Sequence, residues 1–240
     1  MIRILTYNRS HSVKNLGYST STWLDGRVED YQRDVIIRWG NNCLINGREF
    51  PNVLNPARAI TLNMSKILAH DALSEVVNTP RMYRKYTPNF GTFVVRPCAH
   101  EGGSGFRVVE ANGRAINLSQ GCEYATEYIR TNCEYRVWFC GRRTLRAQRA
   151  RTPEQQRVAI PRFICRSKWG YNFLDEVPTA LHNQTLQAAK AIGLDCGAAD
   201  VLLSNGRWYF LELNSGCSTD LGYLQRWFKE GINRLVNERF

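Results

Sequence analysis

The chain has 240 residues, of which 43% are hydrophobic, so it can bury one large core or form two lobes that share a cleft. This composition excludes wholesale disorder, and no apolar run reaches the roughly 18 residues that a membrane-spanning helix needs. The net charge is +11, and arginine far outnumbers lysine. Because the planar guanidinium of arginine binds phosphate and carboxylate through two parallel hydrogen bonds, the sequence favours partners that carry these groups, nucleic acid among them.

The cysteines and the first residues indicate the cellular setting. None of the eight cysteines forms a C-x-x-C pair, which leaves zinc-binding and thioredoxin-like interpretations without support. The start, MIRILTYNRS, has too short an apolar stretch for a signal peptide. We therefore expect free thiols, a cytoplasmic location and no membrane partner. The oligomeric state stays open.

Residues 1–62 are expected to form a short, incomplete α/β region. The apolar segments Ile2–Tyr7 and Val35–Arg38 are predicted strands, and most of the chain between them is a predicted loop. Trp39-Gly40-Asn41-Asn42 follows the second strand, where it either lines a cleft or makes a plain turn.

A helix is predicted over residues 63–78, because apolar residues recur there at helical spacing. Asn63 or Ser65 can cap its start, and Thr79-Pro80 ends it. Lys66 lies in the first turn, where the helix dipole does not favour a cation. Either an anion lies nearby or the lysine is simply exposed.

The segment GTFVVRPCAHEGGSGFRVVE, residues 91–110, predicts two strands joined by a glycine-rich loop. Arg96 follows the first strand, and the loop contains Gly102, Gly103, Ser104 and Gly105. Glycines let backbone N–H groups approach phosphate oxygens without Cβ clashes, although many ordinary hairpins also carry them. A P-loop and a Rossmann fingerprint are excluded, since no helix follows the loop.

Residues 124–150 predict three strands, over 124–129, 134–140 and 144–150. Glu127 and Glu134 flank a short connector that could hold a planar ring against backbone groups, or they pair with arginine. A basic run suggests an anionic ligand, with a solvated face as the alternative; its members are Arg142, Arg143, Arg146, Arg149 and Arg151. Further on, we expect a short helix from Thr152, a strand at 163–165, and a loop over 168–172 that could cover a ligand.

The last part of the chain predicts two helices around a hairpin. The helices span 178–192 and 221–239. Between them, Asn205-Gly206 is a strong two-residue hairpin signal. Alternation points Glu212 and Asn214 to one face, and the hairpin brings Asp200 close to them. Two carboxylates and an amide oxygen suit Mg²⁺ shared with substrate phosphates, while a surface hairpin with polar ends is the alternative.

Four of these segments, in this order, resemble the ATP-grasp superfamily of carboxylate–amine ligases. They are NMSKILAHDALSEVVNTP, VVRPCAHEGGSG, TEYIRTNCEYRV and DVLLSNGRWYFLELN. The pattern is similar to that of the D-alanine–D-alanine ligase and ribosomal-protein glutamate ligase families. The resemblance implies an α+β fold in which two lobes hold ATP between them, with residues 63–126 and 127–240 as the lobes and 1–62 as a short N-terminal region.

The resemblance also implies roles for individual residues. Lys66, Arg96 and the loop at 102–105 would contact the phosphates. Glu127 would face the adenine amino group, the backbone of Tyr128, Ile129 and Arg130 would hold the base, and Glu134 would bind the ribose. Asp200, Glu212 and Asn214 would carry Mg²⁺, for which Mn²⁺ could substitute.

The implied reaction activates a carboxylate as an acyl-phosphate and joins it to an amine, on a small molecule or on an acidic peptide or protein. Two departures from the family matter: Arg96 stands where the family has a phosphate-binding lysine, and Ala198 stands where D-alanine–D-alanine ligase has an arginine. Arg136, Arg149 and Arg162 are candidates to supply that charge. Two alternatives are an ATP-grasp kinase and a basic nucleic-acid-binding module; the second would not need the three metal ligands together.

Overall fold

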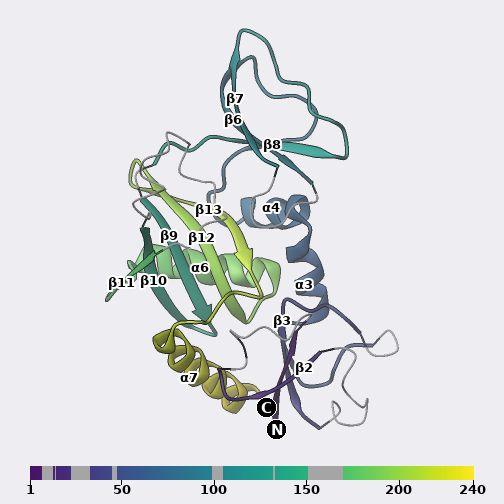
Figure 1. The fold of residues 1–240 in the computed structure, drawn as a ribbon, viewed down its shortest axis with the longest axis vertical. Helices are drawn as coiled ribbons and strands as arrows, with labels where there is room; N and C mark the ends of the chain where they lie inside the picture. Colours follow the sequence, from purple (N-terminus) through teal and green to yellow (C-terminus); the bar gives the residue numbers. More distant parts are fainter. Residues whose placement is uncertain are drawn as a thin grey trace.

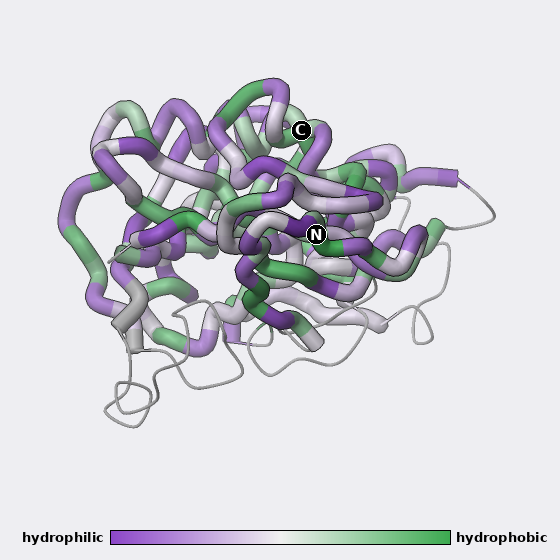
Figure 2. The backbone as a smooth tube through the Cα atoms, turned by 90° about the horizontal axis from the view of Figure 1, so that it is seen from above, coloured by the Kyte–Doolittle hydropathy of each residue, from purple (hydrophilic) through white to green (hydrophobic). Residues whose placement is uncertain are grey.

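The structure, a computed structural model, describes residues 1–6, 13, 15–22, 33–44, 48–98, 105–131, 133–150 and 170–240. Within them the chain forms three β-sheets and four helices. Figure 1 shows the sheets following one another along the longest axis, with both chain termini at the same end. Figure 2 shows hydrophilic and hydrophobic stretches interspersed along the backbone. None of the described helices is long and apolar enough to cross a membrane.

The N-terminal sheet is parallel and has the order β2-β1-β3-β4. Its strands are β1 (Ile2–Thr6), β2 (Ser19–Thr22), β3 (Val35–Trp39) and β4 (Val53–Leu54). The predicted strands β1 and β3 are present. β2 lies where a loop was expected, and β4 lies in a segment for which no strand was predicted. β2 reads STST and β4 has two residues, so neither carries enough apolar alternation to be recognised.

The helix predicted over 63–78 is present as α4 (Lys66–Ser74), with Ser65 as its N-cap, but its predicted bounds are wrong, and a further helix, α3 (Ala57–Met64), was not predicted. Ser65 has an extended backbone, and its hydroxyl accepts a hydrogen bond from the Leu68 amide. This local bond caps α4, as expected for serine, and competes with a continuous helix. The helix also ends at Ser74, well before the Thr79-Pro80 turn.

The second sheet is a small antiparallel sheet with the order β5-β8-β6-β7. It contains β5 (Met82–Tyr83), β6 (Phe90–Pro97), β7 (Arg107–Asn112) and β8 (Glu123–Glu127). The two strands predicted on either side of the glycine-rich loop are β6 and β7, which pair with each other. β8 pairs with the other side of β6, so Tyr124 lies opposite Arg96.

The third and largest sheet has the order β11-β10-β9-β12-β13, with every pair antiparallel. Its strands are β9 (Cys133–Cys140), β10 (Arg143–Ala150), β11 (Gly170–Leu174), β12 (Cys196–Ser204) and β13 (Arg207–Asn214). The expectation of a loop over 168–172 is wrong from Gly170 onward, where β11 pairs with β10. The short helix and the strand expected between 152 and 165 lie outside the described residues.

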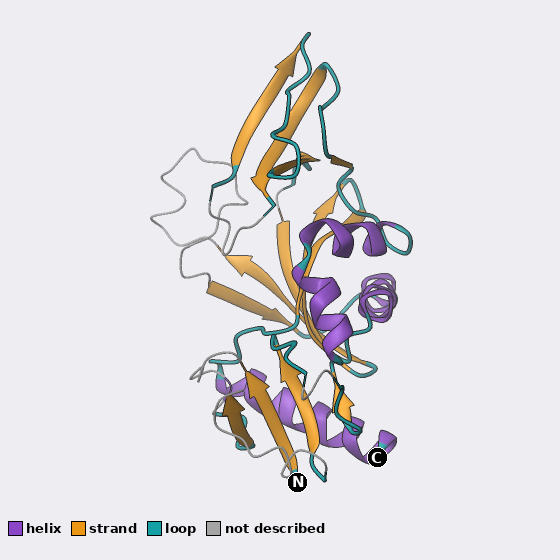
Figure 3. Cartoon of the chain, turned by 90° about the vertical axis from the view of Figure 1, so that its right-hand side faces the viewer, coloured by secondary structure: helices purple, strands orange, loops and turns teal. Residues whose placement is uncertain are grey.

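Helices cover both faces of this sheet. α3, α4 and α6 (Thr179–Ile192) stack on one face (Figure 3), where their apolar residues share a core with Val137, Phe139 and Phe210. α7 (Gly222–Arg239) packs on the other face, in a core that includes Trp138 and residues of the N-terminal sheet. Two predictions based on glycine are confirmed. α6 ends at Gly193, which has φ 86°, and Asn205-Gly206 forms the hairpin turn with φ 48° and 73°.

Candidate functional site

The β12–β13 hairpin brings its three predicted metal-ligand side chains together. Asp200 lies directly opposite Glu212, and Asn214 Nδ2 is 3.4 Å from Asp200 Oδ2 and 3.5 Å from Glu212 Oε1. The register shifts between Asp200 and Val201, so that Val201 pairs with Phe210. Because of this bulge, Phe210 and Leu213 both lie in the core on the α6 side of the sheet, although they are three positions apart. Bulges are common next to active sites, where they change the direction of a side chain.

Each of the two carboxylates lies against a cation. Lys66 Nζ is 2.7 Å from Glu212 Oε2, and Arg136 Nε is 3.2 Å from Asp200 Oδ1. The anion expected near Lys66 is therefore Glu212. Burial raises the pKa of Glu212, but the charges of Lys66, Arg96 and Arg136 outweigh it and lower this pKa to about 2. Glu212 is consequently ionised at neutral pH, as a metal ligand must be.

The donor set fits a hard cation. Among the described residues, no group of three His, Cys, Asp or Glu side chains could hold a metal ion. The hairpin instead offers the two carboxylates of Asp200 and Glu212 together with the amide of Asn214. An amide carries an acceptor oxygen beside its NH₂ donor, and turning it over presents that oxygen to the cation. Oxygen donors of this kind suit Mg²⁺, which also keeps waters and substrate phosphates as ligands.

Arg96 lies on β6 across from this hairpin and has the features of an anion-binding residue. Its Nε is buried and has no hydrogen-bond partner among the described residues. Tyr124, its neighbour on β8, is only 4% exposed, and burial raises the pKa of this phenol to about 12 although the Arg96 charge opposes the shift. Glu212 raises the same pKa, so β6, β8 and the hairpin share one electrostatic environment.

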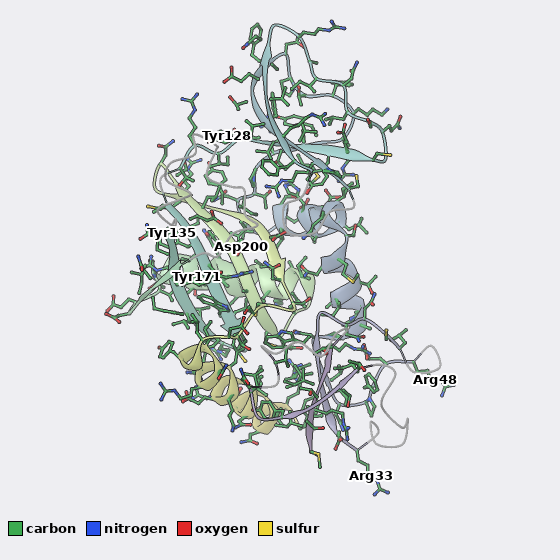
Figure 4. All side chains as sticks on the ribbon, viewed as in Figure 1. Arg33, Arg48, Tyr128, Tyr135, Tyr171 and Asp200 are labelled. Atoms are coloured by element: carbon green, nitrogen blue, oxygen red, sulfur yellow. The ribbon has the colours of Figure 1, made fainter. Side chains whose placement is uncertain are left out.

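The segment expected to hold a planar ring joins the small sheet to the large one, where Figure 4 labels Tyr128. Glu127 is exposed, Ile129 is buried, and Glu134 is half-buried at the start of β9. Two backbone groups already have partners: the Tyr128 N–H donates to the Thr92 carbonyl, and the Arg130 carbonyl accepts from the Ser204 hydroxyl.

The glycine-rich loop is described only at its end. Gly102, Gly103 and Ser104 lie outside the described residues, as does Arg162. Gly105 has φ 73°, and a Cβ there would lie 3.0 Å from the Pro97 ring. Glycine is therefore required at this position for both backbone and steric reasons.

The described part of the basic run is divided between the two faces of the large sheet. Neighbouring strand positions point to opposite faces, so the run is divided between them. Arg143 contacts Glu230 and the Trp227 ring of α7 on one face, whereas Arg146 lies 5.3 Å from the Tyr135 ring centroid on the other. The backbone of Arg149 lies opposite Tyr171 on β11, and Arg151 is outside the described residues.

Tyr171 is a site residue that sequence reasoning missed. Its hydroxyl accepts a hydrogen bond from Arg136 Nη1 at 3.2 Å. Figure 4 labels Tyr171 and Asp200 on the same five-stranded sheet. Tyr171 and Phe173, two positions apart, both pack against the core on the α7 side of the sheet. This strand-like spacing was missed because the segment was interpreted as a loop.

Cys217, just after the hairpin, is a structural residue. Burial raises the pKa of its thiol to about 12, and its carbonyl accepts a hydrogen bond from the Trp39 indole. Such a thiol is not a nucleophile at neutral pH. The seven cysteines within the described residues are all free thiols, as the sequence predicts.

Comparison with solved structures identifies the fold. The ATP-grasp ligase PsnB complexed with minimal precursor, Mg and ADP matches with a TM-score of 0.66 and 14% identity, over 97% of this chain and 96% of that one. The macrocyclase MdnC bound with precursor peptide MdnA, from Microcystis aeruginosa MRC, gives 0.62 and 13% over 100% of both chains. D-alanine–D-alanine ligase from Bacillus anthracis complexed with ATP gives 0.58 and 12%, over 100% of this chain and 99% of that one.

The chain therefore has the ATP-grasp fold, as its sequence motifs predict. No protein-family model matches the chain, and no curated protein does. At identities of 12–14% the likeness defines the architecture, and the chemistry has to be argued from this chain's own residues.

Proposed function

We propose that this protein is an ATP- and Mg²⁺-dependent ligase that activates a carboxylate and joins it to an amine. The observation that carries the proposal is the convergence of Asp200, Glu212 and Asn214 on one hairpin, with Lys66 and Arg136 as their cationic neighbours. Carboxylates and cations arranged in this way serve phosphoryl transfer, in which positioning and charge stabilisation supply most of the catalysis.

In this proposal residues 63–126 and 127–240 are the two lobes that hold ATP, and residues 1–62 are a smaller N-terminal region. Lys66, Arg96 and the loop at 102–105 orient the triphosphate. Glu127 and the backbone of 128–130 hold the adenine, and Glu134 binds the ribose. Mg²⁺ held by the hairpin ligands would offset the negative charge of the phosphates; Mn²⁺ has the same ligand preferences.

The proposed reaction has two steps. A substrate carboxylate oxygen attacks the γ-phosphorus and ADP leaves, which gives an acyl-phosphate. An amine then attacks the acyl carbon, phosphate leaves, and the nitrogen loses a proton to form the amide. Arg136 has the position to balance charge in both steps, because it lies against Asp200 on the same face of the sheet. No covalent enzyme intermediate is needed, which agrees with the buried, protonated Cys217.

The substrate class we propose is an acidic peptide or protein. Two observations support it: the net charge of +11, and the precursor peptides bound to PsnB and MdnC in structures that this chain resembles. A positive surface accelerates the encounter with an acidic partner and does so less at high salt.

Calorimetry with ATP, with and without Mg²⁺, tests the nucleotide part of the proposal. Metal-dependent binding in the micromolar to millimolar range is expected, and no binding at millimolar ATP would overturn it. A screen of acids and amines for ATP-dependent phosphate release then separates a ligase from a kinase: a ligase releases phosphate only when both substrates are present, whereas a kinase leaves a stable phosphorylated product. Salt-sensitive binding of nucleic acid without any need for Mg²⁺ would favour the nucleic-acid-binding alternative.

A further inference from the structure

Arg136 is held from two opposite sides within the large sheet. On β12, its cross-strand neighbour Asp200 places Oδ1 3.2 Å from Arg136 Nε. On β11, two strands away in the other direction, the Tyr171 hydroxyl lies 3.2 Å from Arg136 Nη1. The contact at Nε is an ion pair and the contact at Nη1 is a hydrogen bond, so a charge on one side and a hydroxyl on the other restrict the orientation of the guanidinium.

The intervening strand makes this contact across β10 possible. Ala147 lies opposite Arg136 on one side and opposite Phe173 on the other, and it is fully buried. A larger residue at this position would stand between Arg136 and Tyr171. The small methyl group leaves room for the two long side chains to meet above the strand.

The ring of Tyr171 is itself held in place. It packs edge-on against Trp138, with centroids 5.4 Å apart, and Trp138 is only 1% exposed. Trp138 in turn stacks on Phe173 at 5.5 Å. The hydroxyl of Tyr171 is therefore presented by an aromatic cluster and not by a freely moving side chain, which is the arrangement that keeps a site residue in its working geometry.

We infer that Tyr171 is a positioning residue that aims the Arg136 guanidinium at the transferring phosphoryl group. The inference rests on the proposed function. It also accounts for Ala198, which stands where the resemblance to D-alanine–D-alanine ligase implies an arginine. Here β9 supplies a guanidinium on the same face, directly across from Asp200, and Tyr171 on β11 supports it. Ala198 is fully buried opposite Trp138 on β9, so an unpaired charge at that position would be costly.

The test compares Tyr171→Phe with a matched control. The Phe variant keeps the ring against Trp138 and removes only the hydroxyl. Tyr18→Phe is the control, because the Tyr18 hydroxyl also has partners, Asn233 Oδ1 at 2.8 Å and the Lys229 carbonyl at 3.1 Å, but lies against α7. Tyr171→Phe should lower kcat about 10- to 100-fold, the effect of a small misplacement of a reacting group, while the KM for ATP stays within about twofold. Tyr18→Phe should leave both unchanged.

A double-mutant cycle separates positioning from a general structural role. If Tyr171 acts through Arg136, then Tyr171→Phe should have no further effect on kcat in an Arg136→Met background. If Tyr171→Phe loses its cooperative thermal transition, Arg136→Lys replaces it, since lysine keeps the charge near Asp200 but has no Nη1 for Tyr171, and the same kcat-only loss is expected.

Two results overturn the inference while leaving the proposed function intact. The first is a kcat for Tyr171→Phe equal to that of Tyr18→Phe in an enzyme that binds MgATP and turns over. The second is an equal loss from Tyr171→Phe in the wild-type and Arg136→Met backgrounds. If the wild-type protein fails to bind MgATP in calorimetry, the proposed function is wrong and the inference falls with it.

Discussion

Replacement of Arg96 by methionine tests the phosphate side of the site most directly. Arg96 is the cation on β6 whose Nε is buried without a hydrogen-bond partner among the described residues, and its charge helps to lower the pKa of Glu212. Methionine keeps the apolar stem that packs beside Tyr124 but removes the charge and all donors. The perturbation therefore keeps the apolar stem on β6 and removes one cation that the proposed function assigns to the nucleotide phosphates.

The expected loss follows from what such a group contributes. Removal of one preorganised charge-stabilising donor costs about 2–4 kcal/mol of transition-state stabilisation. Since about 1.4 kcal/mol is a factor of ten, Arg96→Met should lower kcat/KM about 30- to 1,000-fold. Arg96→Lys should fall between the wild type and Met, because it keeps the charge but loses the planar fork.

The assay is ATP-dependent phosphate release with the substrates found in the screen. Arg84→Met is the matched control: Arg84 is half-exposed and pairs with Asp71 on the surface, a type of interaction worth under about 1 kcal/mol. The alternative is a surface ion pair of Arg96 with Glu101 or Glu110. The register places Glu110 opposite Thr92, four positions away, and Glu101 lies outside the described residues. Near-wild-type turnover of Arg96→Met would refute the assignment and with it the alignment of the 91–110 segment to a phosphate loop.

Three further predictions follow from the hairpin. Glu212→Gln should abolish turnover yet keep nucleotide binding by calorimetry; a lost cooperative thermal transition would instead assign Glu212 a structural role. Because the pKa of Glu212 is lowered to about 2 from an ordinary value near 4.3, the stability it contributes is complete above about pH 5 and lost as pH falls toward 2. The difference in denaturation midpoint between wild type and Glu212→Gln should therefore shrink from pH 6 to pH 3, and a constant difference would contradict this. Gly197→Ala should destabilise the protein by about 1–3 kcal/mol in chemical denaturation, since a Cβ there would lie 2.6 Å from the Asn214 carbonyl oxygen and 2.9 Å from Phe139; Gly222→Ala, with open space around it, is the control.

The sequence by itself determined the local elements and the order of the motifs. The Asn205-Gly206 turn, the α6 helix that ends at Gly193, and the two strands around the glycine-rich loop all follow from short-range signals. These signals suffice because a turn, a cap or an amphipathic face is specified by residues within a few positions of one another. The motif order then sufficed to identify the ATP-grasp fold.

Only the tertiary structure decided which charges meet. Lys66 reaches Glu212 across 146 positions of sequence, and Arg136 meets Tyr171 only because β11 joins the sheet beside β10. Strand order and register depend on pairing between distant segments, which no local pattern encodes. The same is true of the bulge after Asp200 and of the division of the basic run between two faces, since a one-residue shift in a strand moves a side chain to the opposite side of the sheet.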